Sequence, residues 1–446
     1  MWQINHFFNS AKENCFYTGL TGPVWIVDLV DKEPCKINTS LLCASNTSTA
    51  KNLVGSLVPS LLAQKLTCIG ITFHKVEKNQ IISSLVGLEI GHYSFKGRAQ
   101  TPYYQIQNGT KAISNEIKQA ASLCGVSTNI SRHLVNLPGN KLNPKTYAEA
   151  AKTLFKGSKN TKVKVIDRNK LGELGYELLL TVGDSASAAP CIVHLRYRPQ
   201  GAKGKPVAFV GKGITFDSGG INVKPHAGMR LMKKDMGGSA ALMGLAYYLD
   251  HSNIKKPVDI YLCLAENAID SKSARPGDVI KSKAGVEVEI HHTDAEGRLA
   301  LASGLTMAQN AGKKDAPRAV IDVATLTGAI KIGLGSDVAG LFSNNDKLAA
   351  KIENASHSSG EHCWRMPMYQ NYRSQIKSSF GDIVNSGGGY GGAITAALFL
   401  ESFVENDIPW AHLDIYAWND SPKGAVTEVG GSGQSVGLLI DLMKTI

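Results

Sequence analysis

The second half of the chain alternates short runs of β-branched and aromatic residues with stretches that carry apolar residues at three- and four-residue spacing. The first pattern predicts strands, and the second predicts helices packed on a sheet. Strands are predicted at residues 163–167, 191–198, 207–211, 258–265, 286–290, 319–326 and 411–418, and helices at 239–249, 297–310 and 393–404. This order is typical of an α/β domain with a mostly parallel central sheet.

The first part of the chain has a similar but weaker pattern. Apolar runs such as GPVWIVDLV and LTCIGITF alternate with polar turns, and a helical segment, NEIKQAASLCGVSTNISRHLVN, follows them. We therefore predict two domains, a smaller N-terminal α/β domain over residues 1–125 and a larger C-terminal catalytic α/β domain over residues 126–446. The boundary is placed between Gln105 and Leu137, and the first domain is expected to serve oligomerisation or regulation.

Composition adds a location and a class of partner. The chain has 446 residues, of which 43% are hydrophobic and 19% charged, as in ordinary globular proteins. No apolar run approaches the roughly 18 residues of a membrane span, and the N-terminal stretch lacks the pattern of a secretory signal, so we predict a cytoplasmic protein without a membrane partner. A formal net charge of +11 favours anionic partners, which makes nucleic-acid binding a secondary hypothesis.

Several common catalytic signatures are absent from the sequence. It has no G-x-x-x-x-G-K-[ST], no H-E-x-x-H and no G-x-S-x-G, which argues against a P-loop, a zincin helix and an α/β-hydrolase elbow. A G-x-G-x-x-G match at 387–392 lacks a clear preceding strand and a later acidic ribose ligand. We interpret it as a flexible loop that lines a site.

Acidic residues gather in two dense segments that follow predicted strands. These segments are residues 210–225 with 231–238, and residues 291–305. Ligands of open α/β sheets bind beyond the carboxyl ends of the strands, where these segments can converge. The converging side chains are Lys212, Asp217, Asp235, Asp294 and Glu296. Four buried carboxylates repel one another unless cations offset them, so we predict two divalent ions, with Mn, Mg, Co and Zn suited to carboxylate and neutral amine ligands.

Simpler interpretations of the same residues remain open on spacing alone. Asp217 and Asp235 could be ordinary turn or capping residues, and Asp294 and Glu296 could be acids of a strand-end turn and a first helical turn. A different two-metal hydrolase, such as a phosphoesterase, would also use acidic ligands.

The dense segments resemble the leucyl aminopeptidase (cytosol aminopeptidase) family of dinuclear metallopeptidases. The family hallmark N-T-D-A-E-G-R-L stands at 292–299 as HTDAEGRL, and its G-K-G-I-T-F-D-S-G-G stretch stands intact at 211–220. The resemblance covers roughly residues 130–446 and continues through DVATLTGA and WAHLDI. A lysine ligand and the whole hallmark argue against a phosphoesterase.

This resemblance implies a metal-dependent aminopeptidase that releases N-terminal amino acids, leucine-like ones preferred, from peptides through a water activated by two metals. Its implied metal ligands are Lys212, Asp217, Asp235, Asp294 and Glu296, its catalytic residues are Lys224 and Arg298, and its substrate-binding residues are Met232, Thr325, Leu326 and Gly328. Arg298 would hold a bicarbonate. Two divalent ions per subunit, Mn or Zn with Co or Mg as alternatives, and a homohexamer are also implied. For some family members a DNA-binding or regulatory role is the alternative.

Three features depart from the family pattern. His292 replaces the hallmark asparagine, and Ser239 stands where alanine is usual. The stretch from Tyr416 to Asn419 differs from that of members with an open apolar pocket for the first side chain. The departures remove no ligand, but they put a preference for leucine in question.

Overall fold

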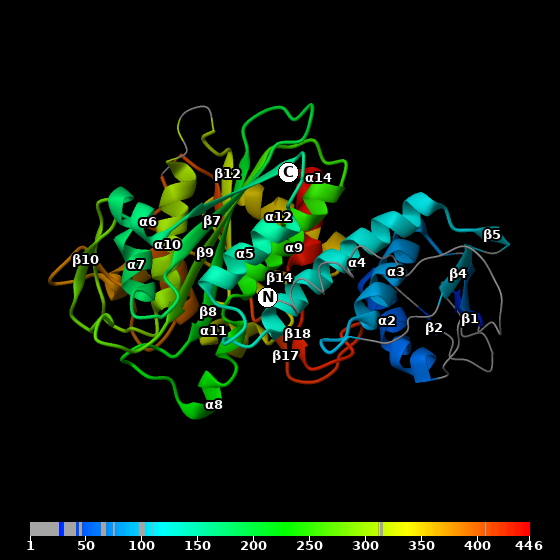
Figure 1. Cartoon of the computed structure of the whole chain (residues 1–446), viewed down its shortest axis with the longest axis horizontal. Coiled ribbons are helices and arrows are strands. Elements are labelled where there is room, and N and C mark those ends of the chain that lie inside the picture. Colours follow the sequence, from blue (N-terminus) through cyan, green and yellow to red (C-terminus); the bar gives the residue numbers. More distant parts are fainter. Residues whose placement is uncertain are drawn as a thin grey trace.

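The long helix α4 (Asn115–Asn136) lies between two β-sheets, a smaller one near the start of the chain and a larger one formed by the rest (Figure 1). The computed structural model describes residues 26–30, 42–43, 47–63, 68–74, 76–97, 103–108, 110–310, 312, 315–405 and 407–446. Helix α4 contacts α3 (Lys78–His92) on one side and α9 (Gly237–His251) on the other. It therefore packs on both parts of the molecule.

The smaller sheet has the order β2-β1-β3-β4-β5 and is parallel except where β5 meets β4. Its strands are β1 (Ile26–Val30), β2 (Leu42–Cys43), β3 (Cys68–His74), β4 (Tyr103–Asn108) and β5 (Lys111–Ala112). Helices α2 (Thr47–Ala63) and α3 pack together beside it. Phe73 from β3, Leu85 from α3 and Tyr104 from β4 are fully buried, so this part has a core of its own.

The larger sheet has eight strands in the order β14-β13-β16-β12-β8-β9-β7-β6. Their bounds are β6 (Thr161–Ile166), β7 (Cys191–Tyr197), β8 (Val207–Asp217), β9 (Val258–Asn267), β12 (Ala319–Ala324), β13 (Ala339–Ser343), β14 (Cys363–Arg365) and β16 (Trp410–Asp414). Strands β16, β12, β8 and β9 pair in parallel, whereas β7 and β6 at one edge, and β13 against β16, are antiparallel. This confirms the predicted α/β class with a mostly parallel central sheet.

Helices cover both faces of this sheet, because its central strands are apolar on both sides. Phe209 of β8 packs into the cluster formed with α4, α9 and the helices α5 (Pro144–Leu154), α12 (Asp346–Ser359) and α14 (Val436–Thr445). The next residue, Val210, packs into the opposite cluster with α6 (Arg168–Leu174), α7 (Glu177–Gly183), α10 (Glu296–Gln309) and α13 (Gly392–Glu401). Alternate residues of a strand thus pack into the two cores on opposite faces of the sheet.

Short elements connect these layers. They are α8 (His226–Met229), η1 (Met232–Lys234), β10 (Val279–Lys281), β11 (Glu287–Glu289), α11 (Gly328–Leu334), η2 (Gln370–Ile376), β15 (Ile383–Val384), β17 (Trp418–Asn419) and β18 (Gly430–Gly431). Across the residues described, no helix has both the length and the apolar character needed to cross a membrane.

Most predicted elements of the larger part are confirmed within a few residues, but three predictions were wrong in detail. The segment 286–290 contributes β11 to a separate three-stranded sheet, β10-β11-β15, rather than to the central one. The strand predicted at 411–418 ends at Asp414, since the backbone turns at Ala417, where φ is 60°. The strand predicted to end at residue 211 continues to Asp217.

The glycines of β8 explain the third error. The predicted strand ended at Gly211, yet Gly211 and Gly213 both lie inside β8, where neighbouring atoms leave no room for a side chain. A Cβ at Gly211 would come within 2.8 Å of Ser239 Cα, and one at Gly213 within 2.7 Å of Cys263 O. These glycines permit close packing of α9 and β9 on β8.

The predicted domain boundary at residues 125 and 126 stays a prediction. Helix α4 runs without interruption through these positions, so no break in secondary structure marks the boundary.

Candidate metal centre

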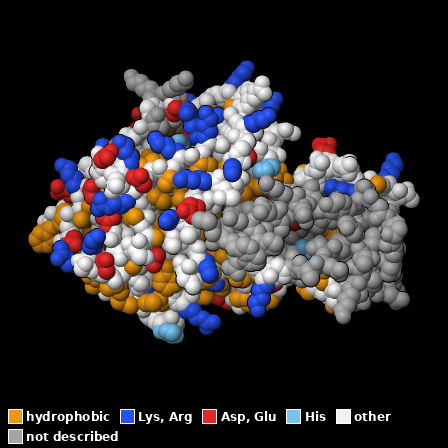
Figure 2. Space-filling model, viewed as in Figure 1, with side chains coloured by type: hydrophobic (Ala, Val, Ile, Leu, Met, Phe, Trp, Pro, Cys, Tyr) orange, Lys and Arg blue, Asp and Glu red, His pale blue; other side chains and the backbone are white. Residues whose placement is uncertain are grey.

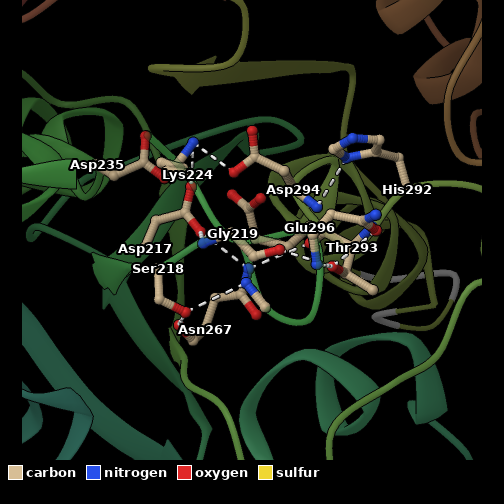
Figure 3. Close-up of polar contacts among 12 residues, drawn as sticks. Asp217, Ser218, Gly219, Lys224, Asp235, Asn267, His292, Thr293, Asp294 and Glu296 are labelled. Atoms are coloured by element: carbon tan, nitrogen blue, oxygen red, sulfur yellow. Dashed lines mark hydrogen bonds and ion pairs between the residues drawn. The ribbon is translucent and has the colours of Figure 1, made fainter. Parts of the chain in front are cut away.

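The acidic side chains named from the sequence meet beyond the carboxyl ends of the central strands (Figure 3). Asp217 is the last residue of β8, and Glu296 is the first residue of α10, two positions after Asp294. One ligand oxygen from each of these three carboxylates can be chosen so that all lie within 4.8 Å of one another. Asp235 follows η1, just before α9 begins. The predicted convergence of these side chains beyond the carboxyl ends of the strands is therefore seen in the structure.

Two lysines are paired with the four carboxylates. Lys212 Nζ lies 2.7 Å from Asp235 Oδ2 and 3.0 Å from Glu296 Oε1. Lys224 Nζ lies 2.8 Å from Asp217 Oδ2 and 2.5 Å from Asp294 Oδ1. Two ammonium groups do not balance four carboxylates, so negative charge remains in excess in a largely buried site.

The pKa shifts have the same cause. Burial raises the pKa of Glu296 to about 8, and the charge of Asp217 adds to the rise while Lys212 opposes it. Burial and Asp217 also raise the pKa of Asp294, against the opposing effect of Lys224. Burial disfavours the charge of Lys212, but Asp235 and Glu296 outweigh burial, so its pKa is raised. Burial first, and the neighbouring Asp217 charge second, thus penalise ionisation of Glu296 and Asp294.

An unpartnered carboxylate oxygen indicates that these residues suit divalent cations. Glu296 Oε2 is buried and has no hydrogen-bond partner among the described residues, although buried carboxylate oxygens are normally satisfied. The carboxylate donors suit Mn, Mg, Co and Zn. Lys212 would become a ligand only after losing its proton, which a nearby dication favours by repelling the ammonium charge.

A close approach of α10 to β8 shapes the centre. Gly297 follows Glu296 at the start of α10 and faces the side chain of Lys212. A Cβ at this position would lie 2.4 Å from Lys212 Cε and 2.5 Å from its Nζ. The glycine therefore leaves the space that Lys212 occupies.

Sequence reasoning missed the asparagines that hold the acids. Asn267, the last residue of β9, donates from Nδ2 to Asp217 Oδ1 at 2.8 Å and to the Thr293 carbonyl at 3.1 Å. Asn385 Oδ1 accepts from the backbone amides of His291 (2.7 Å) and His292 (3.0 Å), and its Nδ2 donates to the His292 carbonyl at 2.7 Å. Both asparagines thereby fix the loop that carries Asp294.

The residues expected to bind substrate lie beside the acids. Thr325 follows β12; its carbonyl accepts from Lys212 Nζ at 2.9 Å, and its hydroxyl donates to Asp235 Oδ1 at 2.8 Å. Leu326 comes next, Gly328 begins α11, and Met232 begins η1.

Asp414 of β16, which sequence reasoning also missed, holds the segment that follows β12. Its Oδ1 accepts from the amides of Leu326 (3.0 Å) and Thr327 (3.3 Å), and its Oδ2 accepts from the Thr327 hydroxyl at 2.6 Å. Asp414 is fully buried.

Arg298 is the third residue of α10, two positions after Glu296. It is buried, its guanidinium carbon is 5.8 Å from the Phe399 ring centroid, and its Nη1 has no hydrogen-bond partner among the described residues. Burial lowers its pKa to about 10, which leaves it charged at neutral pH. A buried cation with a spare donor can hold an anion.

The departures from the family pattern leave the acids in place. His292 Nδ1 accepts from the Asp294 amide at 3.2 Å, and the Ser239 hydroxyl donates to the Met236 carbonyl at 2.8 Å. Tyr416 lies against Lys234, whose Nζ is 4.4 Å from the ring centroid. Burial lowers the pKa of Lys234 to about 8, with Asp235 opposing, so it is largely an ammonium at neutral pH.

Comparisons with known proteins show which sequences and folds this chain is similar to. A family model described as "Cytosol aminopeptidase family, catalytic domain" matches residues 129–440. A probable cytosol aminopeptidase of Nostoc punctiforme is 42% identical over 396 residues, which cover 85% of this chain and 78% of that protein. One from Chlorobaculum tepidum is 43% identical over 322 residues, covering 72% of this chain and 63% of that protein.

Solved structures extend the similarity to the fold. The bottromycin maturation enzyme BotP in complex with Mn has a TM-score of 0.85 and 29% identity, with 94% of this chain and 98% of that chain covered. The cytosol aminopeptidase of Coxiella burnetii has a TM-score of 0.82 and 30% identity, with coverage of 96% and 99%.

Proposed function

The chain belongs to the cytosol aminopeptidase family of metal-dependent peptide hydrolases, and on that premise we propose that it removes the first residue of peptides with two divalent ions held at the acid cluster. The observation that carries the two-ion proposal is the excess of buried carboxylates over ammonium groups, with Glu296 Oε2 left without a partner among the described residues. Mn or Zn is proposed, with Co or Mg as alternatives.

The residues that would hold the two ions are Lys212, Asp217, Asp235, Asp294 and Glu296. Bound there, the ions would supply Lewis acidity to the scissile carbonyl and lower the pKa of the attacking water.

Lys224 would stabilise the charge that develops on the substrate. Its ammonium is paired with Asp217 and Asp294. Once cations neutralise these carboxylates, Lys224 can turn its N–H donors to the carbonyl oxygen as that oxygen becomes negative. Such a donor acts more strongly on the transition state than on the bound peptide.

Arg298 would position the group that accepts the water proton. Its free Nη1 donor and buried charge suit a small anion such as bicarbonate, with a basic oxygen left over for the proton. Met232, Thr325, Leu326 and Gly328 would border the pocket for the first side chain. A homohexamer and a cytoplasmic location are proposed with the function.

The test is hydrolysis of aminoacyl-coumarin substrates by protein stripped of metal with a chelator. We expect activity to return with Mn, Zn, Co or Mg, and an N-acetylated leucyl substrate to stay intact because a free amino group is required. Folded protein that cleaves no free-amine substrate with any of these metals would contradict the proposal. Cleavage of the acetylated substrate would point to a different peptidase specificity.

A further inference from the structure

One lysine near the centre lacks a paired carboxylate. Lys234 is only 6% exposed, and its Nζ forms no ion pair or hydrogen bond with any residue that the structure describes, although Asp235 and Asp414 lie near enough to act on its charge. Its Nζ lies over the ring of Tyr416. By contrast, Lys212 and Lys224 each pair with two carboxylates. The Lys234 ammonium keeps some contact with solvent, and an apolar ligand that removed this contact would leave the charge without a counter-ion at a cost.

A second ammonium lies on the same tyrosine. Lys331 Nζ is 3.9 Å from the Tyr416 ring centroid and 2.6 Å from its hydroxyl oxygen. Asp420 Oδ2 is 3.7 Å from this ammonium, but both side chains are largely open to solvent. Because the Lys331–Asp420 ion pair is exposed and therefore weak, Asp420 offsets little of the positive charge of Lys331.

The position of Tyr416 is fixed by its backbone. Gln434 Oε1 accepts hydrogen bonds from the amides of Tyr416 (2.9 Å) and Ala417 (3.0 Å), and Ala417 has the left-handed φ of 60°. The preceding amide, of Ile415, donates to the Ala324 carbonyl at 2.8 Å, next to Thr325. Tyr416 is therefore held beside the loop that follows β12. Such a strained conformation persists only where surrounding contacts enforce it.

Two of the three residues share short segments with the proposed substrate-binding residues. Lys234 lies in η1 with Met232, and Lys331 lies one turn after Gly328 in α11. Tyr416 directly follows Ile415, whose amide bonds the Ala324 carbonyl at the end of β12. We call Lys234, Lys331 and Tyr416 the cationic wall.

We propose that the cationic wall selects peptides whose first residue is acidic, aspartate or glutamate, over those that begin with leucine. This inference rests on the proposed aminopeptidase function. A carboxylate in the pocket would receive charge-assisted hydrogen bonds from Lys234 and from Lys331 or the Tyr416 hydroxyl. A leucine side chain would cover Lys234 with apolar surface and leave it without a partner, which costs binding in the transition state as well as in the ground state.

The experiment compares kcat/KM of the Mn-loaded full chain for Asp-, Glu-, Leu- and Met-coumarin substrates. We expect at least one acidic substrate to exceed leucine by ~10-fold or more. In Lys234→Met, which removes the ammonium but keeps an unbranched side chain one atom shorter, the acidic substrates should lose ~10-fold or more while leucine is unchanged or improved. Lys233→Met is the matched control, because Lys233 Nζ donates to the Asn136 carbonyl at 3.0 Å instead; it should leave the acidic-to-leucine ratio unchanged.

The outcomes separate this inference from the function. Faster cleavage of leucine than of both acidic substrates by the wild type would overturn the inference and leave the aminopeptidase standing. An acidic preference that survives in folded Lys234→Met would overturn the role of the wall. Absence of cleavage of every free-amine substrate would overturn the proposed function itself. If Lys234→Met fails to fold, the wild-type panel together with Tyr416→Phe, which should lose part of the preference, decides the question.

Discussion

At the scale of single residues, the two lysines of the centre differ in how far they can move. The Lys212 side chain is 4% exposed and enclosed by Asp235, Glu296 and the Thr325 carbonyl. The Lys224 side chain is 15% exposed and reaches the acids from a loop. Lys224 can therefore change partners when cations and substrate arrive, whereas Lys212 cannot leave the site.

This difference predicts how Lys224→Ala behaves. We expect turnover to fall by at least ~100-fold, by analogy with the loss of an oxyanion donor. Metal content should stay near that of the wild type, because all five proposed ligands remain. Steady-state kinetics combined with elemental analysis of the purified protein checks both points. Unchanged turnover would remove Lys224 from the mechanism.

Residue chemistry also explains what the sequence could predict. The proposed ligands lie in two dense acidic segments after strands, so charge and sheet geometry alone indicated the cluster. Asn385 and Asp414 act from segments far away in the chain, and an isolated asparagine or a strand aspartate has no spacing that distinguishes it. Tyr416 was recognised as a departure, but its contacts with two lysines depend on the turn at Ala417, which the sequence does not indicate.

At the scale of elements, the loop before α10 is held from outside by β15. Asn385 directly follows β15, is fully buried, and bonds the backbone at His291 and His292. The element that carries Asp294 and Glu296 is thus oriented by a neighbour that contributes no ligand. Such outer residues commonly tune the affinity of a metal site.

Asn385→Ala tests this support. We expect metal affinity to fall by ~10- to 100-fold, as for other residues that orient ligands, and kcat at saturating metal to be less affected. Titration of stripped protein with Mn, followed by activity and by calorimetry, measures both. Asn385→Asp is the control, because it keeps the acceptor oxygen for the two amides and loses the donor. Equal metal affinity in all three proteins would contradict the role.

Helix α4 predicts a pH dependence of stability. His133 on α4 is 4% exposed, its Nδ1 lies 3.2 Å from the Tyr93 hydroxyl oxygen, and burial lowers its pKa to about 4. His133 takes up a proton near pH 6.5 in the unfolded chain but only near pH 4 in the folded chain. Its contribution to the free energy of unfolding is therefore fully present above pH 6.5 and is lost as the pH falls toward 4. This shift corresponds to about 3 kcal/mol.

We expect metal-free wild type to lose more stability between pH 6.5 and 4.5 than metal-free His133→Gln, in which the titrating group is absent. Denaturant unfolding at both pH values gives the difference, and the shared titration of the carboxylates cancels between the two proteins. Parallel losses in wild type and variant would show that His133 does not carry this dependence.

At the scale of the whole molecule, one end carries exposed apolar side chains. Phe380 is 78% and Val279 39% exposed, and both belong to the region around the small sheet β10-β11-β15, where Figure 2 shows hydrophobic side chains gathered at the end of the molecule. Large apolar groups left in water favour self-association. This agrees with the homohexamer that the resemblance implies, which stays a prediction.

Phe380→Glu should therefore weaken assembly. We expect native mass spectrometry of the wild type to give six copies of the 47.7 kDa chain, and the variant to shift toward smaller species at equal concentration. Lys281→Glu on β10 is the control, since it changes charge in the same region without removing apolar surface. Identical mass distributions for wild type and Phe380→Glu would exclude this end from the interface.

The charge of the whole molecule bears on the nucleic-acid hypothesis. Figure 2 shows Lys and Arg side chains spread over the visible face and interleaved with acidic ones rather than gathered into one stripe. The net charge of +11 keeps the hypothesis as a prediction, and affinity for duplex DNA that falls steeply with salt would support it.

The contact between Gly297 and Lys212 constrains how this protein can change over generations. An alanine at 297 would meet Lys212 Cε at 2.4 Å, so the lysine would have to shift away from its carboxylate partners, whereas a shorter residue at 212 would leave room for the methyl group. We therefore expect alanine at 297 to be accepted more readily in a descendant that has already replaced Lys212. Glycine at 297 would then accompany retention of the proposed amine ligand.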